Sequence, residues 1–261
     1  MARMSRLVPA APPRPLRAAV LALVLAAVAL GASATSAGAA GRLFTPLIHL
    51  NACDNARRCA GGNAPENITA IVRGRKPELL TLNEICSESV AQIAAATGYR
   101  RIFTQAGEAR CAGGRGRYGN AILAAPYRTL TPVLELKYAD QQAGPEKRML
   151  TCADSSGALV CVTHLDHRGK AAEQARELRR NLNALLETRN PLMFVGADLN
   201  LAPAATRANA LPAAMARIGD GRVMHVFYSK AFGRLGGQLL TNTLRWTDHR
   251  GLALRARAPA R

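Results

Sequence analysis

The sequence predicts an α/β sandwich that forms one large domain behind an N-terminal export signal. Two observations predict this class. Short apolar runs of strand length alternate with helical patterns, and pairs of strands at hairpin spacing are mixed with strand–helix crossovers. A simple doubly wound sheet would instead show regular strand–helix alternation.

The first 41 residues have the features of a secretory signal peptide. The apolar run Ala18–Leu30 is too short to span a bilayer comfortably, and a tail of small residues with Ala-x-Ala sites follows it. Four arginines and no acidic residue precede the run: Arg3, Arg6, Arg14 and Arg17. We therefore expect residues 1–41 to be removed, leaving a secreted, extracellular domain over 42–261 that is monomeric and has no transmembrane anchor. The alternative is that the run is an N-terminal membrane anchor.

The first half of the domain is expected to hold two helices among its strands. A helix over Asn63–Lys76 begins at Asn63 as a possible cap, with Glu66 three residues later. A second helix covers Ser87–Thr97. The strands expected in this half are Leu43–Asn51, Leu79–Asn83, Asn120–Ala124, Val133–Leu136, Met149–Ala153 and Leu159–His164.

The clearest helix is Ala171–Leu186, where apolar residues recur at intervals of four and three and give one buried stripe. A strand over Leu192–Ala197 and a helix near Ala205–Arg217 follow. The last two expected strands are Val223–Ser229 and Gly251–Arg257.

Six cysteines follow the predicted signal, and an even count in an exported chain indicates three disulfides. Cys152 and Cys161 lie symmetrically about Ser156-Gly157, at facing positions of a predicted hairpin. Cys53 and Cys59 would close a short loop, and by elimination Cys86 pairs with Cys111. No cysteine spacing suits a zinc site.

The chain is strongly basic, with a formal charge of +18 that becomes +14 when the four signal arginines are removed. Such an excess favours an anionic partner, such as nucleic acid, an anionic lipid surface or a polyanionic wall polymer. The alternative is compositional drift of a GC-rich genome toward Arg and Ala.

Polar residues gather where the predicted strands end. They occur at Asn51, Asn83-Glu84, Thr163-His164, Asp198-Leu199-Asn200 and Thr247-Asp248-His249. Loops at strand ends are common positions for reactive groups. Carboxylates and amides without soft ligands suit Mg²⁺, Mn²⁺ or Ca²⁺, and two imidazoles beside them could move protons.

With these motifs, and with Arg117-Tyr118-Gly119-Asn120-Ala121-Ile122-Leu123 between them, the chain resembles the endonuclease/exonuclease/phosphatase superfamily. The resemblance to its deoxyribonuclease I-like members runs from Leu47 to Leu254. It implies a four-layered α/β sandwich, with two packed mixed sheets flanked by helices and the site at one end of the strands.

The resemblance also implies roles for the polar residues. Glu84 matches the main ligand of a divalent ion, Mg²⁺ or else Mn²⁺ or Ca²⁺, with Asn51 and Asp248 as further ligands or water-mediated contacts. Asp198 and Asn200 match the pair that positions the attacking water and holds the phosphate. The other matches are His249 as base or transition-state donor, His164 as acid, Tyr118 and Arg148 as phosphate contacts, and Asn120 as a residue that orients His164.

One position departs from the family pattern. Met224 stands in Val223-Met224-His225-Val226-Phe227 where the family has an Asp that supports the site histidine, and a thioether is a poor acceptor for imidazole. Either another group, such as Asp220, substitutes, or turnover is weakened.

These observations favour a secreted, divalent-metal-dependent phosphodiesterase, with an endonuclease acting on DNA, and also on RNA, as the first hypothesis. Arg110, Arg115 and Arg117 before Tyr118 support it, unless they form only a solvated loop. A lipid phosphodiesterase such as a sphingomyelinase is the second hypothesis. A binding protein that has lost turnover is the third.

Overall fold

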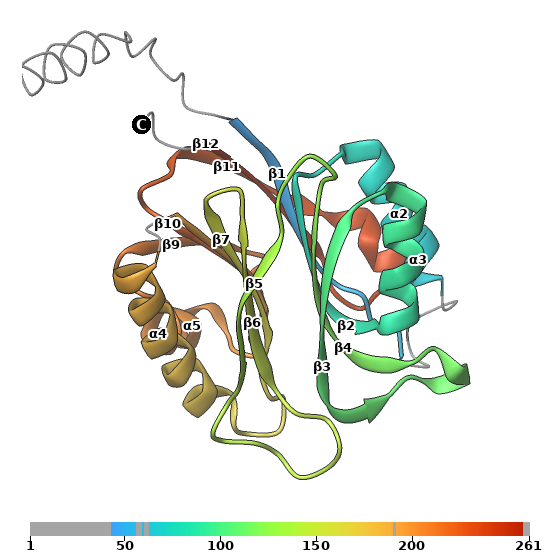
Figure 1. The fold of residues 1–261 in the computed structure, drawn as a ribbon. Helices are drawn as coiled ribbons and strands as arrows, with labels where there is room; N and C mark the ends of the chain where they lie inside the picture. Colours follow the sequence, from blue (N-terminus) through green and yellow to red (C-terminus); the bar gives the residue numbers. More distant parts are fainter. Residues whose placement is uncertain (1–42, 56–58, 60–62, 190–191, 258–261) are drawn as a thin grey trace, which may run out of the picture. The chain divides into compact units, whose positions relative to one another are not determined.

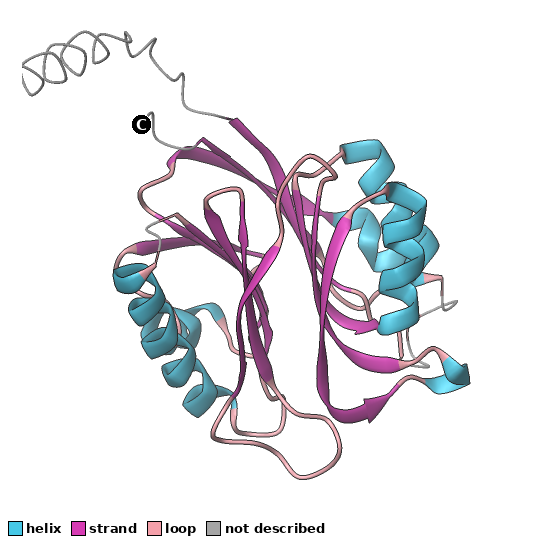
Figure 2. Cartoon of the chain, in the orientation of Figure 1, coloured by secondary structure: helices cyan, strands magenta, loops and turns pink. Residues whose placement is uncertain are grey.

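The computed structural model describes residues 43–55, 59, 63–189 and 192–257, so the predicted export signal lies outside the described residues. Two six-stranded sheets pack face to face with helices on their outer sides, which confirms the four-layered α/β sandwich (Figures 1 and 2). None of the helices described is long and apolar enough to cross a membrane.

The first sheet has the strand order β11-β12-β1-β2-β4-β3, and helices α2 and α3 cover its outer face. Strands β1 and β2 run parallel, and the other neighbours are antiparallel. The elements are β1 (Leu43–Asn51), α2 (Ala64–Arg75), β2 (Leu79–Cys86), α3 (Ser87–Thr97), β3 (Arg100–Arg110), the 3₁₀ turn η1 (Ala112–Gly114), β4 (Arg117–Ala124), β11 (Gly233–Leu240), the 3₁₀ turn η2 (Thr241–Arg245) and β12 (Gly251–Arg257).

The second sheet has the order β5-β6-β7-β8-β10-β9, and helices α4 and α5 lie on its outer side. Here β7 and β8 are the parallel pair. The elements are β5 (Thr131–Lys137), β6 (Met149–Ser155), β7 (Ala158–His164), α4 (Ala171–Thr188), β8 (Met193–Asp198), α5 (Pro203–Asn209), β9 (Met215–Gly219) and β10 (Met224–Ser229).

Most predicted elements are confirmed, but three strands were not predicted from the sequence: β3, β9 and β11. The predicted helix near Ala205–Arg217 is wrong in its second half. Helix α5 ends at Asn209, and residues 215–219 form β9 instead. Pro212 lies between them, and proline both lacks the N–H a helix needs and clashes with the preceding turn. Asn63 precedes α2 as predicted, but its side chain makes no capping bond.

The apolar residues form a core between the sheets and one beneath each helical layer. The inner core joins residues of both sheets, including Leu47, Ile122 and Phe194. On α4 the predicted stripe is buried against the second sheet, with Leu178 and Leu182 fully enclosed. All three predicted disulfides are present: Cys53–Cys59, Cys86–Cys111 and Cys152–Cys161.

At Gly196 of β8 the two sheets come very close. A Cβ there would lie 2.1 Å from Thr81 Oγ1 and 2.6 Å from His49 Nδ1. Only glycine therefore allows the first sheet to approach β8 at this level. Burial lowers the pKa of His49 to about 3, so this imidazole is a neutral packing group.

A second buried histidine, His225 of β10, lies under helix α5. Its Nδ1 is 2.9 Å from Arg217 Nη1 and its Nε2 is 3.0 Å from Thr206 Oγ1. Because a guanidinium only donates, Nδ1 must accept and the proton must be on Nε2. Burial and, second, the charge of Arg217 lower the pKa of His225 to about 4. Protonation would remove the acceptor and place two cations together.

This arrangement predicts loss of stability in mild acid. The unfolded chain binds a proton at His225 near pH 6.5, while the folded chain resists protonation down to about pH 4, so stability is full above 6.5 and falls as pH decreases. Between about pH 7 and 5, denaturant titrations should show the wild type losing about 2 kcal/mol more than His225→Gln. Equal slopes for wild type and His225→Gln would exclude this role.

Candidate active site

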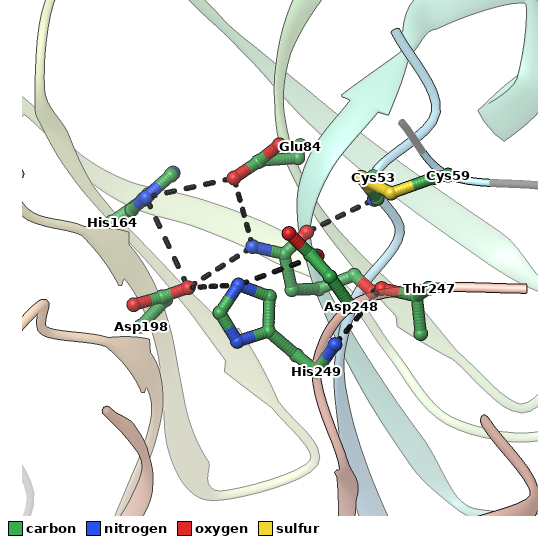
Figure 3. The surroundings of a disulfide bond; sticks show 9 residues. Cys53, Cys59, Glu84, His164, Asp198, Thr247, Asp248 and His249 are labelled. Carbon is green, nitrogen blue, oxygen red and sulfur yellow. Dashed lines mark hydrogen bonds and ion pairs between the residues drawn. A yellow bond between two sulfur atoms is a disulfide. The ribbon is translucent and has the colours of Figure 1, made fainter. Parts of the chain in front are cut away.

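The polar residues predicted at the strand ends meet at one edge of the sandwich. Asn51 and Glu84 come from the parallel strands β1 and β2, and His164 and Asp198 come from the parallel pair β7 and β8. Because the carboxyl ends of parallel neighbours lie at the same edge, each sheet delivers two groups. Asp248 and His249 enter from the segment before β12 (Figure 3).

Glu84 lies at an irregularity that sets its direction. The pairing of β2 with β4 shifts register between Leu82 and Ile85, and Glu84 has a left-handed φ of 53°. Asn200, after β8, is also left-handed, with φ 50°. Bulges re-aim side chains, and non-glycine residues held in this region cluster at functional sites.

Asn51 links the carboxylates of the two sheets. Its Nδ2 donates to Glu84 Oε1 at 2.9 Å and to Asp198 Oδ2 at 3.0 Å. The amide orientation is set by Cys53 N–H, which donates to Asn51 Oδ1 at 2.9 Å. The amide oxygen therefore faces away from the carboxylates. In this orientation Asn51 is a donor that holds two acidic groups together. That Asn51 ligates the ion or contacts it through water stays a prediction.

Asp198, His249 and Glu84 form the cluster that suits a metal ion. Their ligand atoms lie within 4.8 Å of one another, and His249 Nε2 is 3.5 Å from Asp198 Oδ2. Burial raises the pKa of Asp198 to about 6, with the charge of His249 acting in the opposite direction. Two carboxylates and an imidazole fit a hard divalent cation. A second group, Cys53, Cys59 and Asp248, does not, because those sulfurs form a disulfide.

Asp248 lies beside this cluster but is not part of it. Its Oδ1 is 3.4 Å from His249 Nε2, and its side chain is 35% exposed. The preceding Thr247 holds the segment, since its hydroxyl donates to Asn51 O at 2.9 Å and accepts the His249 N–H at 3.4 Å (Figure 3). The loop before β12 is thereby tied to the end of β1.

His164 is buried on the second-sheet side of the site. Its Nε2 is 3.8 Å from Glu84 Oε1 and 3.2 Å from Asn200 Nδ2, whose other proton goes to Leu165 O at 2.9 Å. Burial, and next the charge of Arg148, lower the pKa of His164 well below its usual value. His164 is therefore a neutral imidazole whose Nε2 accepts from Asn200.

Tyr118 and Arg148 line the same cavity of about 480 Å³ as the acidic cluster. Burial and the charge of Glu84 raise the pKa of Tyr118 well above its usual value, so the hydroxyl stays protonated. Arg148 Nη1 forms an ion pair with Glu146 Oε1 at 2.8 Å, and Nη2 donates to His167 Nδ1 at 3.1 Å. Its guanidinium is thus fixed at the cavity wall.

Two residues of the site, Glu146 and His167, were not predicted from the sequence, and Asn83 was predicted at a strand end without a role. Asn83 Oδ1 accepts from Asp198 N–H at 3.1 Å, and its Nδ2 donates to Asn120 Oδ1 at 2.9 Å. The side-chain oxygen of Asn120, which was expected to orient His164, therefore accepts a hydrogen bond from Asn83. Glu146 lies two residues before Arg148, and His167 lies three residues after His164. This closeness to predicted site residues was the signal in the sequence that could have pointed to Glu146 and His167.

Met224 is buried in the core between the sheets, opposite Asp198 on the neighbouring strand. The carboxylates recorded beside His249 are those of Asp198 and Asp248. Asp220, the other suggested substitute, lines the hollow next to His249, and its Oδ1 accepts two backbone N–H groups, from Arg222 and Met224. The missing Asp therefore leaves His249 with two acidic neighbours.

Two mixed sheets that join their strand ends around carboxylates, imidazoles and an arginine give the chain the deoxyribonuclease I-like fold. The sequence pattern of the Endonuclease/Exonuclease/phosphatase family matches residues 51–257, and the chain belongs to this family. Enzymes of this family act on phosphate esters and typically use divalent metals. No protein with a curated description matches the chain in sequence.

Solved structures share the fold at low sequence identity. TDP2 from C. elegans is 16% identical with a TM-score of 0.62, over 82% of this chain and 75% of that one. The human Nocturnin catalytic domain, with a bound sulfate anion, is 16% identical with a TM-score of 0.60, over 83% and 94%. A mannosyl-6-phosphatase of Bacteroides thetaiotaomicron is 13% identical with a TM-score of 0.60, over 81% and 98%.

The cluster predicts that Glu84 dominates metal affinity. Glu84→Gln removes a charge from a group that is only 12% exposed and changes its volume little. We expect Mn²⁺ affinity, measured by calorimetry, to fall at least about tenfold, the equivalent of one charge-assisted contact. Glu108→Gln, whose side chain is 85% exposed, is the matched control and should bind as the wild type does. Unchanged affinity in Glu84→Gln would remove Glu84 from the ligand set.

Proposed function

We propose that this protein is an exported, divalent-metal-dependent phosphodiesterase that cleaves nucleic acid at internal positions. One observation carries the proposal beyond the family's general chemistry. The cavity with the acidic cluster is the middle of three adjoining hollows, and the outer two carry exposed arginines. A polymer bound there would extend past the cluster in both directions.

The hollows adjoin through shared walls. On one side, Glu84, Tyr118 and Glu146 also line a hollow of about 400 Å³ that holds Arg110 and Arg168. On the other side, three central residues also line a hollow of about 520 Å³ with Arg222 and Arg250. Those three are Asn200, Asp248 and His249.

Arginines on both sides favour a chain of phosphates over a single terminal phosphate. Guanidinium groups pair with phosphate oxygens, and neutralising several phosphates supplies most of the affinity for a nucleic acid. The net charge of the full chain is +18, and the +14 that remains without the four signal arginines acts in the same sense. A terminal sugar phosphate would need only one basic wall.

The acidic cluster supplies the site for the cation, with Glu84 as its main ligand and Asp198 and His249 adjoining. A divalent cation there would neutralise a phosphate oxygen and the charge that develops on the leaving group. Asn51 holds the two carboxylates in place by donating to both. Mg²⁺ is the ion we propose, with Mn²⁺ or Ca²⁺ as alternatives of the same hard character.

The remaining residues bind the phosphate and move protons. Arg148, fixed by Glu146, and the protonated hydroxyl of Tyr118 both present donors to the cavity and suit the non-bridging oxygens. Asp198 and Asn200 border the space beside His249 where an attacking water would be oriented. His164 is neutral in the resting site, with Nε2 accepting from Asn200, and it would have to gain a proton before it could act as the acid that the family pattern implies.

Features of the described surface weigh against a lipid substrate. The large hydrophobic side chains exposed in the described part are Tyr127, Leu239 and Leu244, and only Leu244 lines a hollow next to the site. Entry into a bilayer usually needs a larger apolar face.

The three disulfides are consistent with export, because such bonds persist in oxidising compartments.

Cleavage assays test the proposal directly. The oxidised protein should nick supercoiled plasmid and fragment RNA with Mg²⁺, release no phosphate from a sugar monophosphate, and leave sphingomyelin vesicles intact. EDTA should abolish cleavage, since the cluster has no other means of neutralising the phosphate. Hydrolysis of sphingomyelin or of the monophosphate alone would assign a different substrate. Cleavage that survives EDTA would contradict the metal site.

A further inference from the structure

A second hollow, larger than the active-site cavity, lies along helix α2 and contains no acidic residue in its lining. Its volume is about 710 Å³, and Arg75, Arg245 and Arg255 line it together with Asn67, Asn242 and Trp246. We refer to it as the α2 groove. The acidic cluster of the active site lines a different cavity.

The groove exists because the outer face of the first sheet is only partly covered. Helices α2 and α3 pack over β1, β2 and β4, whereas residues 236–239 of the edge strand β11 are exposed. Side chains of α2, of η2 and of the outward face of β12 therefore line an open hollow.

The three arginines come from three elements, and each is exposed. Helix α2, which carries Arg75, is far in the sequence from η2 and β12, which carry Arg245 and Arg255. Among the described residues, no ion pair is recorded for any of them, and the one side-chain bond recorded is from Arg75 Nη1 to Gln238 Oε1 at 3.1 Å. Like charges that converge in a concave channel repel one another and raise the local concentration of anions. An anionic ligand bound between the three arginines would relieve this repulsion.

The shape of the groove suits a linear polyanion. Lining residues run along α2 from Asn67 to Arg75, and eight helical steps of about 1.5 Å give a length of about 12 Å. A single phosphate would occupy a small part of that length. Amide groups at Asn67 and Asn242 add neutral donors beside the guanidinium groups, and Trp246 offers an indole wall on which a base can rest.

The groove is joined to the active site by one short segment. Turn η2 supplies Arg245, and the chain reaches Asp248 and His249 within four residues. Thr243 Oγ1, in the same turn, lies 2.7 Å from Leu240 O and 3.0 Å from His249 O, and its proton is placed between these two carbonyls. A polyanionic ligand held in the α2 groove therefore contacts the same segment of the chain that carries His249.

We propose that the α2 groove is a second nucleic-acid site, which holds the phosphate backbone of a single strand away from the point of cleavage. The choice of nucleic acid as the polyanion rests on the proposed function. The existence of a polyanion site at these arginines rests on the groove alone.

Salt-dependent binding of a fluorescein-labelled oligo(dT), measured by anisotropy in EDTA so that nothing is cleaved, tests this. The variant is Arg75→Gln with Arg245→Gln and Arg255→Gln. Losing three phosphate contacts should lower the slope of log affinity against log salt by about 2. Raising salt from about 50 to about 200 mM should then weaken the wild type about 15- to 20-fold more than the variant.

The matched control removes three exposed arginines from other elements: Arg101→Gln, Arg180→Gln and Arg189→Gln. It should lose at most a small part of the slope. Equal losses in both triple variants, or no loss in the groove variant, would overturn the proposal. Should the groove variant not fold, the single change Arg245→Gln must lower the slope by about one third as much.

The result is separable from the proposed function. If the wild type binds oligo(dT) through the groove but cleaves no nucleic acid with Mg²⁺, the nuclease assignment fails and the groove remains. If cleavage occurs and the groove variant keeps the full salt slope, the groove proposal fails and the nuclease assignment remains.

Discussion

The site depends on a small set of amide–carboxylate contacts that join the two sheets at their common edge. Asn51 and Asn83, from the first sheet, bond the side chain and the backbone of Asp198, from the second. All three residues are buried, and a buried polar group is tolerated only when its partners are in place. These contacts therefore fix the relative position of the sheets, and with it the distances among Glu84, Asp198 and His249.

The sequence pattern predicts the fold well where apolar periodicity is strong, as in α3, α4, β7 and β12. It fails where strands carry little apolar signal. Strand β3 contains four polar or charged residues at its exposed positions, and β11 is interrupted by three glycines. The alanine-rich stretch after Pro203 favours a longer helix than the structure has, because propensity alone does not register the break at Pro212. Tertiary pairing with β10 decides that β9 is a strand.

For the site, the sequence predicts which residues meet but not how they are turned. The motif order places Glu84, Asp198, His164 and His249 together, as found. It does not reveal that the Cys53 N–H sets the orientation of the Asn51 amide by donating to its oxygen. Nor does it reveal that Asn120 accepts from Asn83, or that an ion pair with Glu146 holds Arg148 in place. Each of these depends on a contact between residues distant in the sequence. The absence of the family's Asp at Met224 also depends on contacts between distant residues, since the acidic neighbours of His249 are Asp198 and Asp248.

The central claim is that the two sheets together form a single divalent-cation site. Anomalous X-ray scattering from crystals of the mature protein grown with Mn²⁺ tests it most directly. We expect one strong peak in contact with the Glu84 carboxylate, within the space bounded by Asp198 and His249. A crystal whose anomalous peaks all lie elsewhere, with this space free of Mn²⁺, would contradict it.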